Sequence, residues 1–276
     1  MGIPHYAILG HPVSRSLSPR IHAAFGKQCD IAVTYLALDT ASAGLAATLE
    51  RFEAAGGLGA NVTVPDKAEA AARCHSLSQR ARKAGVANTV TLKDGRWQGD
   101  NTDGTGLVRD LRERRGIELH GARVLLLGAG GAAHGVAPAL LEAGIGELVI
   151  ANRTRSRAYD LLDRLEDEAR TRACTLREVA SLGDFDLNVQ ATSAGLDGEL
   201  PALPDLQPRP ATVCVDLNYG RAALAFMAWA RQVGCQQAFD GLGMLVEQAA
   251  DAFEIWHGVR PRTDPVYARL RLSAGR

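Results

Sequence analysis

The amino-acid sequence predicts an α/β protein in which strands and helices alternate along most of the chain. Short apolar runs such as residues 124–127 lack polar residues, as strands do when a parallel sheet buries both of their faces. Segments with helical periodicity follow these runs at the spacing of β-α-β units, which predicts a doubly wound parallel sheet. After Asp240 the pattern contains helices only, and those helices need another sheet to cover.

The composition favours a protein that binds a small molecule. With 276 residues the chain is long enough for one large or two medium domains. Its 31 basic and 31 acidic residues balance, so charge gives no reason to expect nucleic acid or a membrane as partner. The five cysteines lack metal-binding spacing, and no signal peptide or membrane-spanning run is visible. We therefore expect a reduced, cytoplasmic protein without a structural metal, as a monomer or homodimer.

The N-terminal part of the sequence predicts an α/β unit of its own. Its expected strands span residues 6–10, 33–38, 60–64, 88–92 and 96–99. Its expected helices span residues 41–55 and 66–73, besides a helix that begins with Ser18 as N-cap and Pro19 in the first turn.

The rest of the sequence predicts a second unit that interrupts the first. Its expected strands span residues 124–127, 148–151, 187–190 and 212–217. Its expected helices include residues 103–115, 157–170 and 222–234. The closing helices, 242–257 and 265–272, are expected to cover the N-terminal sheet. This arrangement predicts a discontinuous first domain, residues 1–103 and 239–276, with residues 104–238 inserted.

A glycine-rich loop, GAGGAA at residues 128–133, connects the expected strand at 124–127 to an alanine-rich helix. Such a turn lets backbone N–H groups approach a pyrophosphate at the positive end of the helix. A tight β-to-α turn in another kind of α/β protein would have the same composition. Because a strand and a helix flank the loop, we predict a dinucleotide site on a Rossmann-like sheet.

The end of the next strand indicates which dinucleotide binds. An NAD-binding domain usually places Asp or Glu there, in contact with the ribose. This sequence has Asn152-Arg153-Thr154, with Arg155 and Arg157 close behind. A guanidinium fork suits a 2′-phosphate, so the glycine loop and Arg153 together favour NADP(H). Without the glycine loop, these arginines would indicate only the solvent-exposed start of a helix.

Polar residues gather at segment ends in the N-terminal part and at both crossings into the second unit. Each has an ordinary explanation, such as helix capping for Ser18 and Asp103, or a solvated side chain for Lys67. Their joint position at the ends of strands, where α/β proteins bind ligands, favours a site in one cleft. These candidates are Ser16, Ser18, Asn61, Thr63, Lys67, Asn88, Asp103 and Gln248.

Several motifs follow one another in the order seen in shikimate dehydrogenases: SRSLSPRIH, GANVTVPDK, GVANT, GDNTDG, LLLGAGGAA, NRT, ATSAG and DGLGMLVEQAADAF. The chain resembles this family over nearly its whole length. The resemblance implies an NADP-dependent oxidoreductase acting on a CH–OH group. Its reaction would be reversible reduction of 3-dehydroshikimate to shikimate, in the chorismate pathway to aromatic amino acids.

The resemblance also implies roles for individual residues. Ser16, Ser18 and Tyr219 would hold the substrate carboxylate, and Asn61, Thr63, Asn88 and Gln248 would bind the rest of the substrate. Lys67 and Asp103 would be the catalytic pair. The cofactor would contact Gly128, Ala129, Gly130, Gly131, Ala132, Asn152, Arg153, Thr154 and Arg157, with Thr192 and Gly241 at its nicotinamide end.

The chemistry of the reaction agrees with these roles. A hydride that adds to a ring ketone leaves negative charge on the oxygen, which a lysine ammonium can stabilise and protonate. Asp103 would orient Lys67. The sequence does not indicate which of the two residues transfers the proton.

Two positions depart from the family pattern. Asp66 stands where an apolar or aromatic residue is common, and we expect it to cap a helix and point to solvent. Gln190 stands where Asn often precedes Ala-Thr-Ser.

Two alternative functions stay open. One alternative is an enzyme of the same fold that uses quinate or NAD. The other is a non-catalytic NADP-sensing module, although such a module would be expected to lose Lys67 or Asp103.

Overall fold

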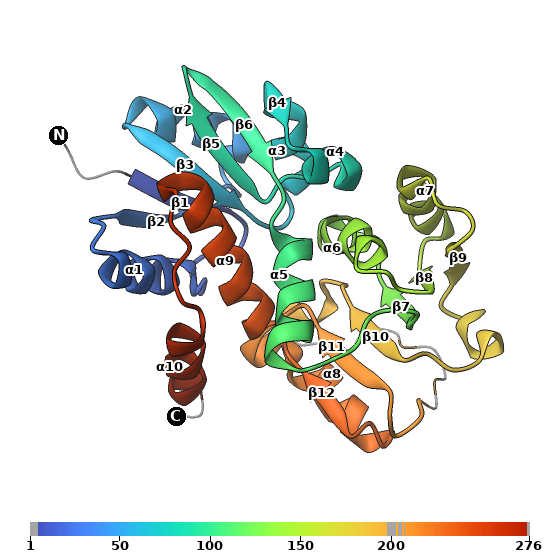
Figure 1. The fold of residues 1–276 in the computed structure, drawn as a ribbon. Coiled ribbons are helices and arrows are strands. Elements are labelled where there is room, and N and C mark those ends of the chain that lie inside the picture. Colours follow the sequence, from blue (N-terminus) through green and yellow to red (C-terminus); the bar gives the residue numbers. More distant parts are fainter. Residues whose placement is uncertain (1–4, 198–202, 204–205, 207, 275–276) are drawn as a thin grey trace. The chain divides into compact units, whose positions relative to one another are not determined.

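The chain forms two compact units, which a computed structural model describes for residues 5–197, 203, 206 and 208–274. The first comprises residues 1–106 and 246–276, and the second comprises residues 107–245. Among the described residues, each unit contains a six-stranded sheet (Figure 1). The predicted fold class is confirmed: an N-terminal α/β part is completed by C-terminal helices, and a Rossmann-like parallel sheet is inserted. The polypeptide passes between the units within two helices, α5 (Asp103–Arg109) and α9 (Leu242–His257).

The sheet of the first unit is mixed, in the order β2-β1-β3-β5-β6-β4. Its strands are β1 (His5–Gly10), β2 (Thr34–Asp39), β3 (Gly57–Val62), β4 (Ser76–Leu77), β5 (Thr89–Lys93) and β6 (Arg96–Asp100). Strands β1, β2 and β3 run parallel, whereas β5 is antiparallel to both β3 and β6. The ends of β3 and β5 therefore meet at Asn61 and Thr89, which are paired in register.

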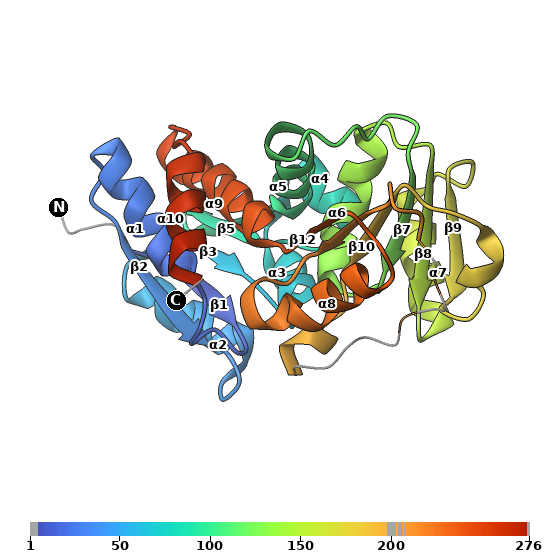
Figure 2. The ribbon, with the colours of Figure 1, turned by 90° about the horizontal axis from the view of Figure 1, so that it is seen from below.

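Helices cover both faces of this first sheet. They are α1 (Ser18–Cys29), α2 (Gly44–Ala54), α3 (Lys67–Arg73), α4 (Gln79–Ala84), α9 and α10 (Asp264–Ala274). Figure 2 shows α2 on one face and α1 with α9 on the other. On the α9 face, Phe253 packs against Phe25 with ring centroids 5.8 Å apart, and Trp256 stacks on Tyr6 at 4.7 Å. Helix α9 thus covers the N-terminal sheet, as predicted, whereas α10 packs against α1.

The sheet of the second unit is entirely parallel, in the order β12-β11-β10-β7-β8-β9. Its strands are β7 (Arg123–Leu127), β8 (Glu147–Asn152), β9 (Thr171–Thr175), β10 (Leu187–Gln190), β11 (Val213–Asp216) and β12 (Gln237–Phe239). The sequence did not predict β9 or β12, which form the two edges of the sheet. Both lack a continuous apolar run, because an edge strand is less enclosed than a central one.

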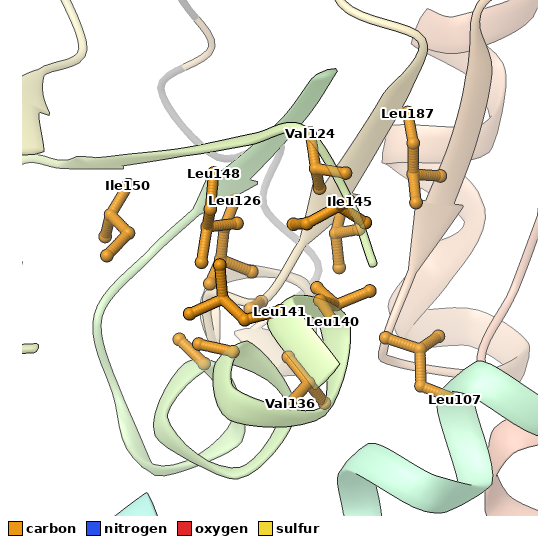
Figure 3. Close-up of a cluster of buried hydrophobic side chains, with 14 of the residues drawn as sticks. Leu107, Val124, Leu126, Val136, Leu140, Leu141, Ile145, Leu148, Ile150 and Leu187 are labelled. Carbon is orange, nitrogen blue, oxygen red and sulfur yellow. The ribbon is translucent and has the colours of Figure 1, made fainter. Parts of the chain in front are cut away.

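The core of the second unit explains why its central strands are apolar throughout. Its helices are α6 (Gly131–Glu142), α7 (Arg155–Leu165) and α8 (Leu224–Gln232). Val124 and Leu126 of β7 face Val136 and Leu140 of α6 (Figure 3). The alternate residues of β7 belong to a separate apolar cluster, which includes Phe226 of α8. A strand enclosed on both faces needs apolar side chains at every position.

Two predicted helices differ from the observed ones. Ser18 is the first residue of α1 and Leu17 the N-cap, so the prediction that Ser18 caps this helix is wrong. The Ser18 backbone N–H instead donates to Ser16 Oγ at 3.2 Å, which puts both serines in one turn. The helix expected at 103–115 is α5 followed by a π-helical turn, Asp110–Arg114.

Candidate active site

Lys67 and Asp103 form a buried ion pair in the first unit. Lys67 is the first residue of α3 and Asp103 the first of α5, so two helix starts position the pair. The Lys67 Nζ donates to Asp103 Oδ2 at 2.5 Å, and the two residues are 8% and 4% exposed. Since removing one partner would leave an uncompensated buried charge, each group holds the other in place.

Asn88 connects this ion pair to two further polar groups. Its Nδ2 donates to Asp103 Oδ1 at 2.8 Å and lies 3.2 Å from Gln248 Oε1 on α9. Its Oδ1 accepts from the Thr102 backbone N–H at 2.8 Å. Four predicted site residues from distant parts of the sequence, Lys67, Asp103, Asn88 and Gln248, therefore form one hydrogen-bonded group.

Asn61 is also a predicted site residue, but its side-chain amide already has hydrogen-bond partners within the protein. Its Oδ1 accepts from the Tyr35 hydroxyl at 2.6 Å, and its Nδ2 donates to Thr89 Oγ1 at 3.1 Å and to the Asn88 backbone oxygen at 3.3 Å. Tyr35 and Thr89 were not among the site residues predicted from the sequence. Thr89 stands beside Asn88 in the motif GVANT, which could have drawn attention to it, whereas Tyr35 is one aromatic residue in a strand and carries no such signal.

Ser16 and Ser18 lie at the start of α1, and Thr63 directly follows β3 in the same unit. Ser18 is buried and hydrogen-bonds Tyr35, while Ser16 is half-buried. Burial raises the pKa of Tyr35 well above its ordinary value, and the bond with Ser18 opposes that rise. The half-buried Thr63 side chain has no hydrogen-bond partner among the described residues, so its hydroxyl is available to a ligand.

Asp66 does not point to solvent as expected. It occupies the N-cap position of α3 without a side-chain capping bond, and it is only 8% exposed. Its Oδ2 accepts from Thr40 Oγ1 at 2.6 Å. The prediction of a solvated cap is wrong because the end of β2 brings Thr40 against the start of α3, which the local sequence of α3 cannot indicate.

The glycine loop of the second unit has the backbone that a phosphate site requires. Gly128 has φ of +106°, and a Cβ there would lie 3.0 Å from Thr192 Cγ2. A Cβ on Gly130 would meet no atom within 4 Å, so the surface over this residue is open. Gly131 begins α6 and Ala132 follows it, so their N–H groups have no acceptor within the helix. This loop, with the buried Ala129, fits the pyrophosphate of a dinucleotide.

The arginines after β8 differ in whether they bind other side chains of the protein. Arg155 donates to the Tyr159 hydroxyl at 3.1 Å and lies 3.7 Å from Glu178 Oε1. Arg153 and Arg157 are exposed, and neither has a hydrogen bond or ion pair to another residue that the structure describes. Asn152 shapes the turn by donating from Nδ2 to the Thr154 backbone oxygen at 2.8 Å. Arg153 and Arg157 are therefore the cations that could meet a phosphate here.

Thr192 and Gly241 lie in loops at the carboxyl ends of β10 and β12. Gln190 Nε2 donates to Thr192 Oγ1 at 2.7 Å and Gln190 Oε1 accepts from Thr192 N at 3.1 Å, so Gln190 supports the loop with both ends of its amide. A Cβ on Gly241 would clash with the Leu217 backbone oxygen, which only glycine avoids. Tyr219 belongs to this second unit and is half-buried.

The described residues contain neither a metal-binding cluster nor a membrane-spanning helix. No group of three or more His, Cys, Asp or Glu side chains there could hold a metal ion. Within the same residues, no helix combines the length and the apolar character needed to cross a membrane.

Comparisons with known proteins identify relatives of the whole chain. Three family models match: the shikimate dehydrogenase substrate binding domain at residues 8–90, shikimate/quinate 5-dehydrogenase at 110–197, and the shikimate 5′-dehydrogenase C-terminal domain at 241–271. A relative from Xanthomonas campestris pv. campestris (strain 8004), named shikimate dehydrogenase (NADP(+)), is 59% identical over 98% of this chain and 96% of its own.

Two solved structures share the fold. An Ael1 enzyme from Pseudomonas putida superposes with a TM-score of 0.86 and 39% identity, over 97% of this chain and 98% of that one. Shikimate 5-dehydrogenase from Thermus thermophilus, solved in complex with NADP(H) and shikimate, gives a TM-score of 0.84 and 36% identity, with the same coverage of 97% and 98%.

Proposed function

This chain belongs to the shikimate dehydrogenase family, and we propose that it catalyses the reversible NADPH-dependent reduction of 3-dehydroshikimate to shikimate. The observation that carries the proposal is the buried Lys67–Asp103 pair, hydrogen-bonded through Asn88 to Gln248. The first unit would bind the substrate and the second would bind NADP(H). The proposed domain limits are residues 1–103 with 239–276 for the substrate and 104–238 for the cofactor.

The substrate offers a carboxylate, hydroxyl groups and a ketone, and the residues of the first unit match them. Ser16 and Ser18 would bind the carboxylate, and the family resemblance would add Tyr219 to this role. Thr63, Asn88 and Gln248 would bind the ring hydroxyls, since each carries a donor or an acceptor. Asn61 would also contact the substrate, although both ends of its amide have partners within the protein, as both ends of the Asn88 amide do.

Lys67 and Asp103 would transfer the proton and stabilise the negative charge that the reaction creates at the ketone. Bound NADPH supplies the hydride. The Lys67 ammonium would stabilise the negative charge that develops on the ketone oxygen and deliver a proton to it from Nζ. Asp103 would hold Lys67 through its Oδ2 and, in the reverse reaction, help Lys67 to accept the proton. The low exposure of both residues strengthens this interaction, because water screens it poorly.

The second unit carries the groups that would select NADP(H). Backbone N–H groups from Gly128 to Ala132 would face the pyrophosphate, and Arg153 with Arg157 would bind the 2′-phosphate. Asn152 and Thr154 would shape the adenosine side of the site, and Thr192 and Gly241 its nicotinamide side. The fit rests on the open surface over Gly130 and on the lack of described partners for the two arginines.

A panel of two substrates and two cofactors tests this function. Shikimate and quinate are each oxidised with NADP+ and with NAD+, and kcat/KM is measured for every pair. We expect shikimate with NADP+ to give the largest value. Equal or greater rates with quinate or NAD+ would favour the broader enzyme. Binding of NADPH without turnover of any pair would favour the sensing module instead.

We also propose that the protein acts in the cytoplasm as a monomer or homodimer, without nucleic-acid or membrane partners. In support, all five cysteines are free thiols in the structure, including Cys214 and Cys235, whose Sγ atoms lie 3.2 Å apart. Reducing compartments keep such pairs open. Cell fractionation and light scattering of the purified protein would test location and oligomeric state.

A further inference from the structure

A buried row of hydrogen bonds runs from Tyr35 to Asp103 in the first unit. Tyr35 donates to Asn61 Oδ1 at 2.6 Å, and Asn61 Nδ2 donates to Thr89 Oγ1 at 3.1 Å. Thr89 Oγ1 donates to Asn88 Oδ1 at 2.9 Å, and Asn88 Nδ2 donates to Asp103 Oδ1 at 2.8 Å. We call these five residues the Tyr35–Asp103 relay.

Two backbone groups determine the direction of the relay. The Asn88 carbonyl oxygen can only accept, so Asn61 must turn Nδ2 toward it and Oδ1 toward the Tyr35 hydroxyl. The Thr102 backbone N–H can only donate, so Asn88 must turn Oδ1 toward it and Nδ2 toward Asp103. With both amides oriented, every link donates toward Asp103, and the Thr89 hydroxyl accepts from one amide and donates to the other.

Packing against other side chains holds Tyr35, the first residue of the relay, in place. The Tyr35 ring stacks on the His22 ring, with centroids 4.2 Å apart and planes within 7°. Burial lowers the pKa of His22 to about 3, so this partner is neutral under ordinary conditions and adds no charge beside the relay. Asn61, Asn88 and Thr89 are each at most 3% exposed, so water cannot replace a lost partner without entering the interior.

We propose that Tyr35 and Thr89 are positioning residues for the Lys67–Asp103 pair. Resting on the proposed function, this assigns the two residues an effect on turnover without contact with substrate or cofactor. The relay supplies the Asn88 Nδ2 donor to Asp103 Oδ1 and leaves Oδ2 for Lys67. Without the Thr89 hydroxyl, Asn61 Nδ2 loses an acceptor and Asn88 Oδ1 loses a donor. The Asn88 amide and the carboxylate beyond it are then less well oriented, and catalysis is sensitive to such small displacements.

Matched substitutions separate this role from general packing. Thr89→Val removes the hydroxyl and keeps the shape, whereas Thr89→Ser keeps the hydroxyl. Tyr35→Phe removes the other hydroxyl of the relay. The controls are Thr91→Val on the same strand and Tyr6→Phe in the same aromatic cluster, whose hydroxyls have no hydrogen-bond partner in the part of the chain that the structure describes.

The experiment measures kcat and KM for shikimate and NADP+, together with the melting temperature of each variant. We expect Thr89→Val and Tyr35→Phe each to lower kcat about tenfold, because the Asp103 carboxylate and Lys67 are then less well oriented. The KM for NADP+ should stay within about twofold of wild type, because no relay residue belongs to the cofactor unit. Thr89→Ser should recover most of the lost kcat, and both controls should match wild type.

The double variant tests whether the two residues act through one relay. If they do, Tyr35→Phe in the Thr89→Val background should lower kcat by much less than tenfold, because the relay is already broken. Wild-type kcat in both single variants would overturn the proposal, even if their melting temperatures fall. Independent, multiplicative losses would also overturn it. A wild-type protein that turns over no shikimate would instead refute the proposed function, so the two failures are distinguishable.

Discussion

Thr40 and Asp66 are joined by a buried hydrogen bond, in which Thr40 Oγ1 donates to Asp66 Oδ2 at 2.6 Å. Asp66 directly precedes Lys67 in the sequence, so this bond ties the end of β2 to the residue before the predicted catalytic lysine. A buried carboxylate is costly unless it is hydrogen-bonded, which makes Thr40 a structural requirement of the turn that starts α3.

Thr40→Val should therefore destabilise the protein. Removing the donor leaves the Asp66 carboxylate with one partner fewer in the interior, at a cost of about 1–3 kcal/mol. Urea unfolding would measure the loss. Thr34→Val is a suitable control, because the Thr34 hydroxyl on β2 has no hydrogen-bond partner among the residues described. An equal free energy of unfolding in the two variants would show that the Thr40–Asp66 bond contributes nothing.

Lys67→Arg should separate charge from proton transfer. Arginine keeps the positive charge beside Asp103, but it does not release a proton at working pH. We expect turnover of shikimate to fall by roughly 10²-fold or more, with little change in the melting temperature. Near-normal turnover in this variant would remove Lys67 from the acid–base role.

Arg153→Ala should weaken the selection of NADP+. We expect the KM for NADP+ to rise about tenfold while the KM for NAD+ changes little, because only NADP+ carries the 2′-phosphate. Arg155→Ala is the matched control, since Arg155 is already engaged by Tyr159 and Glu178. A similar rise in both KM values for Arg153→Ala would mean that this residue does not read the phosphate.

Asp216→Asn should alter how stability depends on pH. Burial raises the pKa of Asp216 to about 7, an effect that hydrogen bonds from Asn218 only partly offset. The folded protein therefore holds a proton that the unfolded chain loses near pH 4, so stability falls as pH rises from about 4 to 7. The isosteric amide abolishes this dependence and still accepts through Oδ1. The stability gain of the variant over wild type should be at least about 1 kcal/mol larger at pH 8 than at pH 5. A gain independent of pH in urea unfolding would contradict this assignment.

Much of the fold follows from local patterns in the sequence. The apolar run at 124–127, the glycine loop and the helical pattern at 242–257 predict β7, the start of α6 and α9 to within a residue or so. Each prediction uses residues close together in the chain, where side-chain periodicity and backbone preferences act directly. The edge strands β9 and β12 were missed because they lack an apolar run.

Local patterns in the sequence predict the fold class, the glycine loop, Arg153 and most of the candidate site residues. The hydrogen bonds among these residues follow from tertiary packing instead. Asn88 and Gln248 are 160 positions apart, and Tyr35 and Asn61 are 26 apart, yet both pairs are hydrogen-bonded. The burial of Asp66 and the links made by Tyr35 and Thr89 depend on strand register and helix packing. Hydrogen-bond partners of this kind come from distant segments, so no local pattern specifies them.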